Sequence, residues 1–263
     1  MTKRKKVGLA LSGGAARGFA HLGVVRALTA HGIPIDFIAG TSAGSIVGAA
    51  LASGLSTEDI ITIGKKLSWY KVSGIPYSVK GLLSNAPMGD ILAESLPFRN
   101  FEELPIPLAV VACSLETGRK VVFRDHGDLI PAIRASCAIP GVFVPVEYEG
   151  QNLIDGGVVA LVPTKEVKRL GAEVVIAVDV NSCGATYFNS PSTFLGVLFQ
   201  SAMLLLRTAG KSQHYHADVV IAPPIAHLRP DEIAKMDEFI ELGEKAALEK
   251  IVEIKKLVFV EDQ

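Results

Sequence analysis

The sequence has few cysteines and almost no excess of charge. Its 263 residues include three cysteines, Cys113, Cys137 and Cys183, and the formal net charge is -1 at pH 7. Three widely spaced cysteines exclude a full disulfide framework and a paired-cysteine metal knuckle, and they fit a reducing cytoplasm. A net charge near zero disfavours nucleic-acid binding through a basic surface. We therefore expect a cytoplasmic protein without a nucleic-acid partner.

The sequence also lacks a segment that reads well as a membrane span or a signal peptide. Residues 37–57 carry no charge and exceed the ~18 apolar residues that can cross a bilayer. They contain four serines, two threonines and several glycines, which favours a buried strand, turn and helix. The basic residues 3–6 precede an apolar run that Gly13, Arg17 and His21 soon interrupt, unlike a signal peptide. A soluble protein is predicted, with peripheral contact at the inner membrane face left open.

Apolar runs typical of buried strands alternate with segments that have apolar residues at helical spacing. This alternation predicts an α/β sandwich, and the near-continuous apolar runs favour parallel strands. We expect strands at 7–12, 37–40, 108–114, 120–124, 173–180 and 218–222, a hairpin of 142–148 with 152–154 about Glu149-Gly150, and helices at 18–31, 45–53, 130–138 and 231–257. We expect one domain over 1–263, with a basic tail at 1–6 and a helical cap at 56–104, where prolines break the helices.

Ser42 lies in the pattern Gly40-Thr-Ser-Ala-Gly44, between an expected strand and an expected helix. This pattern is typical of a nucleophile elbow, a sharp turn that exposes the serine hydroxyl and that small flanking residues tolerate. The following helix directs its positive end at the same place and would help to stabilise an oxyanion. An ordinary tight turn is the alternative, but the position between strand and helix favours a serine nucleophile.

A second glycine-rich turn, Gly13-Gly14-Ala-Ala-Arg17-Gly18, follows the first expected strand. Successive glycines can direct their N–H groups toward one point, as an oxyanion hole requires. Arg17 would either hold the loop in place or neutralise a phosphate near the reacting ester. A nucleotide-phosphate loop is the alternative reading. The turn lacks the Walker lysine, and its glycines do not have the Gly-x-Gly-x-x-Gly spacing.

Ser42 needs a base, and the sequence offers both histidines and aspartates. His214, His216 and His227 come late enough for a Ser…Asp…His order, but none lies in a recognisable active-site turn. We expect His21, on the first helix, to be a packing or surface group.

Asp155 is the stronger candidate, since it ends an apolar strand and the two glycines after it, Gly156 and Gly157, would not crowd Ser42. A carboxyl with a pKa near 4 is a weak base unless desolvation and contact with the serine hydroxyl compensate. A type I′ turn at Asp-Gly is the alternative reading of this motif, and Asp179 is the next candidate acid.

Three motifs in this order resemble those of the patatin-like phospholipases, and most closely those of the compact bacterial branch related to neuropathy target esterase. The resemblance runs from about Lys6 to at least Val180 and includes the segment Ala135–Pro145. The motifs are Gly-Gly-x-x-Arg-Gly (Gly13, Gly14, Arg17, Gly18), Gly-x-Ser-x-Gly (Gly40, Ser42, Gly44) and Asp-Gly-Gly (Asp155, Gly156, Gly157).

The resemblance implies a three-layer α/β/α sandwich with a central, mostly parallel sheet. It implies a Ser42–Asp155 dyad, an oxyanion hole in the Gly13–Gly14 loop with Arg17 at the matching basic position, and hydrolysis of acyl esters such as phospholipids and lysophospholipids. No metal or cofactor is implied. Two alternatives stay open: acyl transfer to an acceptor other than water, and a nucleotide- or anion-binding module.

The uncharged segment 194–206 is too short to span a bilayer. A core helix is one interpretation of this segment, and an acyl-chain groove or a lipid-facing surface is the other. The sequence leaves the oligomeric state open.

Overall fold

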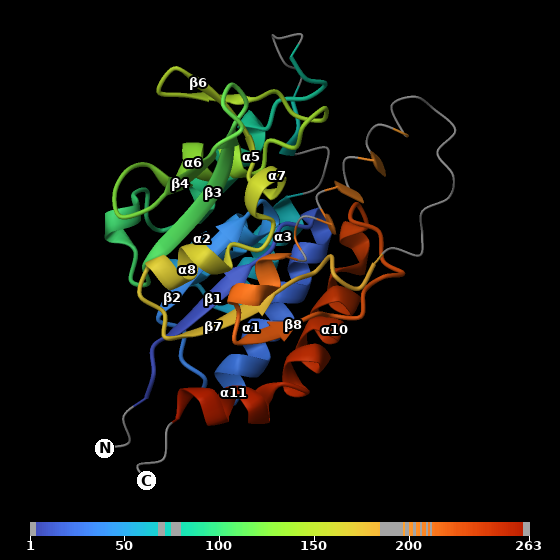
Figure 1. Ribbon diagram of the computed structural model, residues 1–263. Helices are drawn as coiled ribbons and strands as arrows, with labels where there is room; N and C mark the ends of the chain where they lie inside the picture. The colour runs from blue at the N-terminus through green and yellow to red at the C-terminus, as the bar shows by residue number, and fades with distance from the viewer. Residues whose placement is uncertain are drawn as a thin grey trace.

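The computed structural model describes residues 4–67, 72–74, 80–184, 197, 200–201, 204–205, 207–208, 210 and 212–259. Its centre is an eight-stranded mixed sheet (Figure 1). The strands are β1 (Val7–Leu11), β2 (Phe37–Thr41), β3 (Leu108–Ser114), β4 (Lys120–Phe123), β5 (Val146–Tyr148), β6 (Gln151–Asp155), β7 (Val174–Val178) and β8 (Val219–Ile221). They run in the order β5-β6-β3-β2-β1-β7-β8, and β4 also pairs with β3. The neighbours from β3 to β8 are parallel, whereas β4, β5 and β6 pair antiparallel.

Helices cover both faces of this sheet, which confirms the predicted three-layer sandwich (Figure 1). The α-helices are α1 (Phe19–Ala30), α2 (Ala43–Ala52), α3 (Thr57–Lys66), α5 (Ala86–Ser95), α6 (Leu129–Ser136), α7 (Gly157–Ala160), α8 (Thr164–Arg169), α10 (Met236–Leu248) and α11 (Ile251–Val258), and 3-10 turns include η1 (Ala15–Gly18) and η3 (Ser212–His216). The larger core lies under α1, α2, α3, α5, α6 and α10. The smaller core lies on the other face, under α8.

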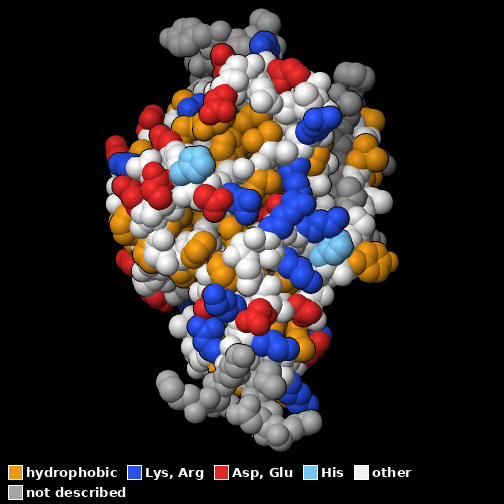
Figure 2. Space-filling view, turned by 60° about the vertical axis from the view of Figure 1, so that its left-hand side comes forward, with side chains coloured by type: hydrophobic (Ala, Val, Ile, Leu, Met, Phe, Trp, Pro, Cys, Tyr) orange, Lys and Arg blue, Asp and Glu red, His pale blue; other side chains and the backbone are white. Residues whose placement is uncertain are grey.

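The two faces differ because the strand residues alternate in size. In β1, Leu9 and Leu11 belong to the larger core, whereas Ala10 belongs to the smaller one. Ala39 and Ala177 continue this row of small side chains across the sheet, so α8 packs close to the strands. The outer side of α8 carries exposed lysine and arginine residues, which form part of the basic band visible in Figure 2.

Most of the predicted elements are present, and two predictions need correction. The expected strand at 142–148 is a strand only from Val146, because residues 142–144 hydrogen-bond to Leu83 instead. The expected helix at 231–257 is two helices, α10 and α11. A tighter turn, in which Lys250 N–H donates to Ala247, separates them. The apolar stripe continues across this turn, which is why the sequence pattern predicts one helix.

The pairing of β3 brings two distant parts of the chain together. Val111 pairs with Thr41 of β2, and the next residue, Ala112, pairs with Asp155 of β6. Because β4 occupies the opposite edge of β3 at these residues, β2 and β6 lie end to end on one edge. β2 runs parallel to β3 and β6 runs antiparallel, so their carboxyl ends meet. The residue after β2, Ser42, therefore lies beside Asp155.

Among the described residues, no helix combines the length and the apolar character that crossing a bilayer requires. The expected cap at 56–104 contains α3 and α5, which pack beside α1, α2 and α6.

Candidate active site

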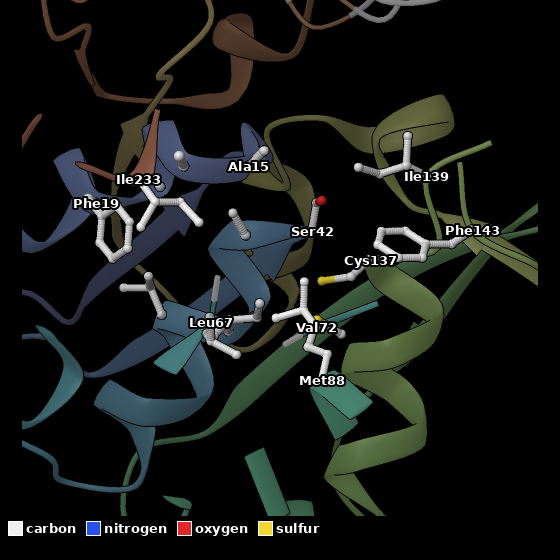
Figure 3. Close-up of a pocket in the computed structure, with 15 residues that line it drawn as sticks. Ala15, Phe19, Ser42, Leu67, Val72, Met88, Cys137, Ile139, Phe143 and Ile233 are labelled. Atoms are coloured by element: carbon white, nitrogen blue, oxygen red, sulfur yellow. The ribbon is translucent and has the colours of Figure 1, made fainter. Parts of the chain in front are cut away.

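Ser42 lies in a strained turn between β2 and α2. Its φ of 52° and ψ of -126° are unusual for a residue with a side chain, and the surroundings must hold such a conformation in place. The Ser42 N–H donates to Ser136 Oγ at 2.8 Å, and the Ser42 carbonyl accepts from Ser45 Oγ at 2.6 Å. The turn is therefore fixed on both sides by serine hydroxyls, and it directs the Ser42 side chain into a pocket (Figure 3).

The glycines on either side of Ser42 are needed because β2 and α2 meet there at close range. A methyl group on Gly40 would overlap the backbone of Gly44, and one on Gly44 would overlap the carbonyl of Leu11. Neither residue has a positive φ, so lack of space explains these glycines.

Asp155 faces Ser42 from the end of β6. Its carboxylate accepts a hydrogen bond from the Gly157 N–H at 2.7 Å, and the Ser42 hydroxyl lies close enough to lower its pKa. Burial raises the pKa of Asp155 to about 6, against the smaller opposing effects of the nearby Ser42 hydroxyl and the Gly157 N–H. The carboxyl is therefore a better proton acceptor than an exposed aspartate.

The segment after Asp155 continues directly into a short helix. Gly156 has φ -65° and ψ -16°, and α7 begins at Gly157. The type I′ turn that Asp-Gly often forms is thus absent here. A side chain on Gly156 would overlap the carbonyl of Val111 in β3, so this glycine lets β6 pass close to that strand.

The loop between β1 and α1 presents backbone N–H groups beside Ser42. The Gly13 N–H donates to the Leu161 carbonyl at 3.1 Å, and the Arg17 N–H donates to the Gly14 carbonyl at 3.1 Å. Within the described part of the chain, no backbone carbonyl accepts a hydrogen bond from the N–H groups of Gly14 and Ala15. Ala15 lines the pocket with Ser42, and its φ of 50° marks a second strained turn there. Among the expected oxyanion donors, Gly13 is thus engaged elsewhere, and the amide of Ala15 becomes a candidate.

Arg17 holds the loop in place. Its side chain is 3% exposed and donates hydrogen bonds to the backbone carbonyls of Val180, Gly184, Ile225 and Leu228 at 3.0 to 3.4 Å. Of the two roles considered for this residue, the contacts support anchoring. They leave the guanidinium directed into the protein, which argues against a phosphate-binding role.

The histidines considered as bases lie elsewhere. His214 Nε2 bonds to Asp179 Oδ2 at 2.7 Å, so these two candidates pair with each other. His227 bonds to Glu238 at the surface. No histidine is among the described residues that line the pocket. His21 is a buried packing group, whose ring bonds to the Ser12 carbonyl and whose pKa burial lowers to about 4.

The pocket at Ser42 is almost entirely apolar. Its interior encloses about 130 Å³, and its mouth is open to solvent. Figure 3 shows Ser42 between Ala15 and the pair Ile139 and Phe143. Cys137 also lines the pocket, and burial raises the pKa of its thiol, so it stays uncharged.

A second, smaller cavity lies behind the pocket, between α1, α2, α3 and α5. Phe19, Ile46, Val47 and Leu67 line both spaces and form the wall between them. The inner cavity has only apolar lining, because Leu22, Leu92 and Leu96 close its far side. A hydrocarbon chain that begins at Ser42 therefore has apolar surroundings beyond the reacting carbonyl.

Sequence reasoning did not identify two residues that contact this site. Ser136 holds the backbone of Ser42, and Asn181 donates from Nδ2 to the Gly13 carbonyl at 2.6 Å. Ser136 lies in the segment Ala135–Pro145 that the family resemblance includes, whereas Asn181 gives no signal beyond its place after a predicted strand. Among the described residues, no three histidine, cysteine, aspartate or glutamate side chains gather as a metal site would require.

Comparisons with known proteins identify the family of this chain. A family model described as patatin-like phospholipase matches residues 9–168, a range that includes Ser42 and Asp155. An uncharacterized NTE family protein of Mycobacterium tuberculosis is 37% identical over 183 residues, which are 68% of this chain and 50% of that protein. A protein named lysophospholipase NTE1, from Scheffersomyces stipitis, is 30% identical over 270 residues, which are 90% of this chain and 17% of that protein.

The chain thus spans half or less of the length of these curated relatives. Among solved structures, VipD from Legionella pneumophila is similar with a TM-score of 0.56 and 16% identity, covering 95% of this chain and 67% of that one. At this identity the similarity concerns the fold, and it agrees with the sandwich described above.

Proposed function

The chain belongs to the patatin-like phospholipase family, and we propose that it hydrolyses acyl esters of lipids through Ser42 and Asp155. The observation that carries this proposal is the position of Ser42 beside the buried carboxylate of Asp155, whose pKa is raised to about 6. A serine with an adjacent base, at the mouth of an apolar pocket, is what nucleophilic attack on a lipid ester requires.

In the proposed first half-reaction, Ser42 Oγ attacks the acyl carbonyl while Asp155 accepts the hydroxyl proton. The negative oxygen of the tetrahedral intermediate is stabilised by the N–H groups of Gly14 and Ala15 and by the amino end of α2. When the intermediate collapses, the ester C–O bond breaks and Asp155 returns the proton to the leaving alcohol. The acyl group is then bound to Ser42.

In the second half-reaction, Asp155 takes a proton from water, and the resulting hydroxide attacks the acyl-serine carbonyl. Collapse breaks the bond to Ser42 Oγ, the serine recovers its proton from Asp155, and the fatty acid leaves. An alcohol acceptor in place of water would give acyl transfer through the same intermediate, which remains the alternative. A nucleotide- or anion-binding role is less well supported, since Arg17 is directed into the protein.

The acyl chain would occupy the pocket at Ser42 and extend toward the inner cavity behind Phe19 and Leu67. Apolar lining stabilises a chain by roughly 0.8 kcal/mol per buried methylene. Lysophospholipids and phospholipids are thus the substrate class we favour, in agreement with the name of the yeast relative.

Contact with a lipid surface is part of this proposal. The segment 194–206 lies largely outside the described residues, but Val197, Leu204 and Leu205 are described and are 49%, 49% and 72% exposed. Exposed apolar side chains of this kind favour a segment that inserts among lipids over a helix buried in the core. Sedimentation with anionic vesicles tests this contact, and a protein that stays wholly in the supernatant would contradict it.

The enzymatic proposal is tested with lysophosphatidylcholine as substrate. We expect the wild type to release free fatty acid and Ser42→Ala to release none above the blank, with the folded state checked by circular dichroism. Adding glycerol distinguishes the alternative: monoacylglycerol formed in place of fatty acid would indicate a transferase. No product of either kind would contradict the proposal.

A further inference from the structure

The loop after β7 is hydrogen-bonded to the glycine-rich loop at two successive residues. The Val180 N–H donates to Ser12 Oγ at 3.0 Å, and Asn181 Nδ2 donates to the Gly13 carbonyl at 2.6 Å. Asn181 is only 7% exposed. Its amide is therefore committed to one backbone oxygen of the loop that borders Ser42.

This contact fixes the orientation of one peptide group. The Gly13 carbonyl and the Gly14 N–H belong to the same planar, trans peptide, so they point in opposite directions. With the carbonyl held by Asn181, the Gly14 N–H must point away from Asn181. On the other side, the Gly13 N–H is held by the Leu161 carbonyl at 3.1 Å, so the residue is fixed at both ends.

A peptide between two glycines needs such a lock. Glycine adopts positive and negative φ with similar ease, so a Gly-Gly peptide can rotate at little cost. Rotation would exchange the N–H for a carbonyl oxygen, which would repel a developing oxyanion.

We propose that Asn181 is a positioning residue: it holds the Gly13–Gly14 peptide in the orientation that directs the Gly14 N–H at the oxyanion formed on the ester bound to Ser42. This inference rests on the function proposed above and adds a residue to it. Asn181 acts through the backbone and does not itself touch the substrate.

A second layer of contacts holds Asn181 in turn. Its N–H donates to Asp179 Oδ1 at 2.9 Å, and Asp179 Oδ2 bonds to His214 Nε2 at 2.7 Å. Asp179 is 2% exposed. The aspartate and histidine that the sequence offered as alternative bases therefore support the turn that carries Asn181.

The test compares three variants in one turn. Asn181→Ala removes the donor, and we expect kcat on p-nitrophenyl butyrate to fall about 10- to 100-fold. This fall is somewhat smaller than the one caused by the complete loss of an oxyanion donor. KM should change less than threefold. Asn181→Asp keeps the shape but places an acceptor against the Gly13 carbonyl, so its kcat should fall further. Ser182→Ala is the control, because Ser182 Oγ bonds to the Asp179 carbonyl inside the same turn. Its kcat should stay within twofold of wild type.

A second readout separates positioning from a general structural role. An alkyl trifluoromethyl ketone adds to serine as a tetrahedral oxyanion, whereas an ether analogue of a lysophospholipid binds without forming one. In Asn181→Ala the affinity for the ketone should fall in step with kcat/KM, and the affinity for the ether should not change.

A kcat of Asn181→Ala within twofold of wild type, or equal weakening of both ligands, would overturn this inference while the proposed function stands. If Asn181→Ala does not fold, the near-isosteric Asn181→Asp decides by the same two criteria. A wild type without Ser42-dependent hydrolysis would overturn the proposed function and this inference with it.

Discussion

The carboxyl ends of the strands and the helices that line the pocket differ in the interactions that hold their residues in place. At the sheet edge, Ser42, Asp155 and the Gly13–Gly14 loop are held by hydrogen bonds with defined donors and acceptors. The wall formed by α1, α2, α3 and α5 presents only apolar side chains to the two cavities. The first region depends on the direction of its hydrogen bonds, whereas the second depends on the volume that its apolar side chains leave open. The difference indicates that strand ends supply the chemistry and that helices select the acyl chain.

This comparison predicts that changes at the sheet edge affect all substrates alike. Ser42→Ala and Asp155→Asn should each lower kcat at least about 1,000-fold on p-nitrophenyl esters of every chain length, because both groups act in the reaction itself. His227→Ala, at a surface ion pair, is the control and should keep nearly full activity. Near-normal rates for Asp155→Asn would show that the base lies elsewhere.

The next effect concerns stability, at two glycines of α2. Gly44→Ala places a methyl group against the Leu11 carbonyl, so the turn must open, and we expect a loss of several kcal/mol in the free energy of unfolding. In Gly48→Ala, the new methyl meets only side-chain methyl groups, those of Ile38 and Leu108 at 3.1 and 3.3 Å, and no backbone atom. This control should stay within about 1 kcal/mol of wild type. Denaturant unfolding measures both, and equal losses would contradict the role of the close approach.

Changes in the helical wall should alter the preference among substrates and leave the chemistry intact. Phe19→Leu thins the wall between the two cavities, and we expect kcat/KM for the decanoate relative to the butyrate ester to rise about tenfold. Gly64→Ala should lower this ratio, because the added methyl pushes the Phe19 ring.

Phe101→Leu is the control for the wall, since Phe101 is a buried ring outside both linings. The expected tenfold change in the decanoate-to-butyrate ratio of kcat/KM assumes that further methylenes of the longer chain become buried, each contributing about 0.8 kcal/mol. If all three variants shifted the ratio equally, the inner cavity would not be the acyl site.

The last prediction concerns pH dependence, whose effect on the rate is small near neutral pH. With a pKa of about 6, Asp155 must lose its proton to act as base, so kcat/KM should fall about tenfold per pH unit below 6 and level off above it. The contribution of Asp155 to stability should follow the opposite trend. The raised pKa favours the protonated carboxyl in the folded state, so the contribution of Asp155 to stability is greatest below pH 4 and is lost as pH rises through 6. Asp155→Asn should remove this decline, and a decline that persists would point to another group.

Part of this molecule was predictable from its sequence. The motifs at Ser42 and Asp155 identified two residues that the structure brings together, and the apolar periodicities identified most strands of the sheet. The patterns at 142–148 and 231–257 were misleading. Apolar periodicity does not show that residues 142–144 pair with Leu83, and it does not show where the last helix is interrupted by a tighter turn.

Other features depend on contacts between distant residues and were not predictable. The meeting of β2 and β6 requires the register of β3, in which Val111 and Ala112 take different partners on one edge. The inward direction of Arg17 and the bond from Asn181 to Gly13 depend in the same way on the loop after β7. The wall at Phe19 depends on how α1 and α3 pack.

The most direct test of the central claim is the rate at which a fluorophosphonate labels the protein. We predict a single adduct, located by mass spectrometry on the peptide that contains Ser42, and a labelling rate at least about 100-fold lower in Asp155→Asn with its fold intact. This result would show that Ser42 is a nucleophile activated by Asp155. An adduct on another residue, or an unchanged rate in Asp155→Asn, would contradict the account.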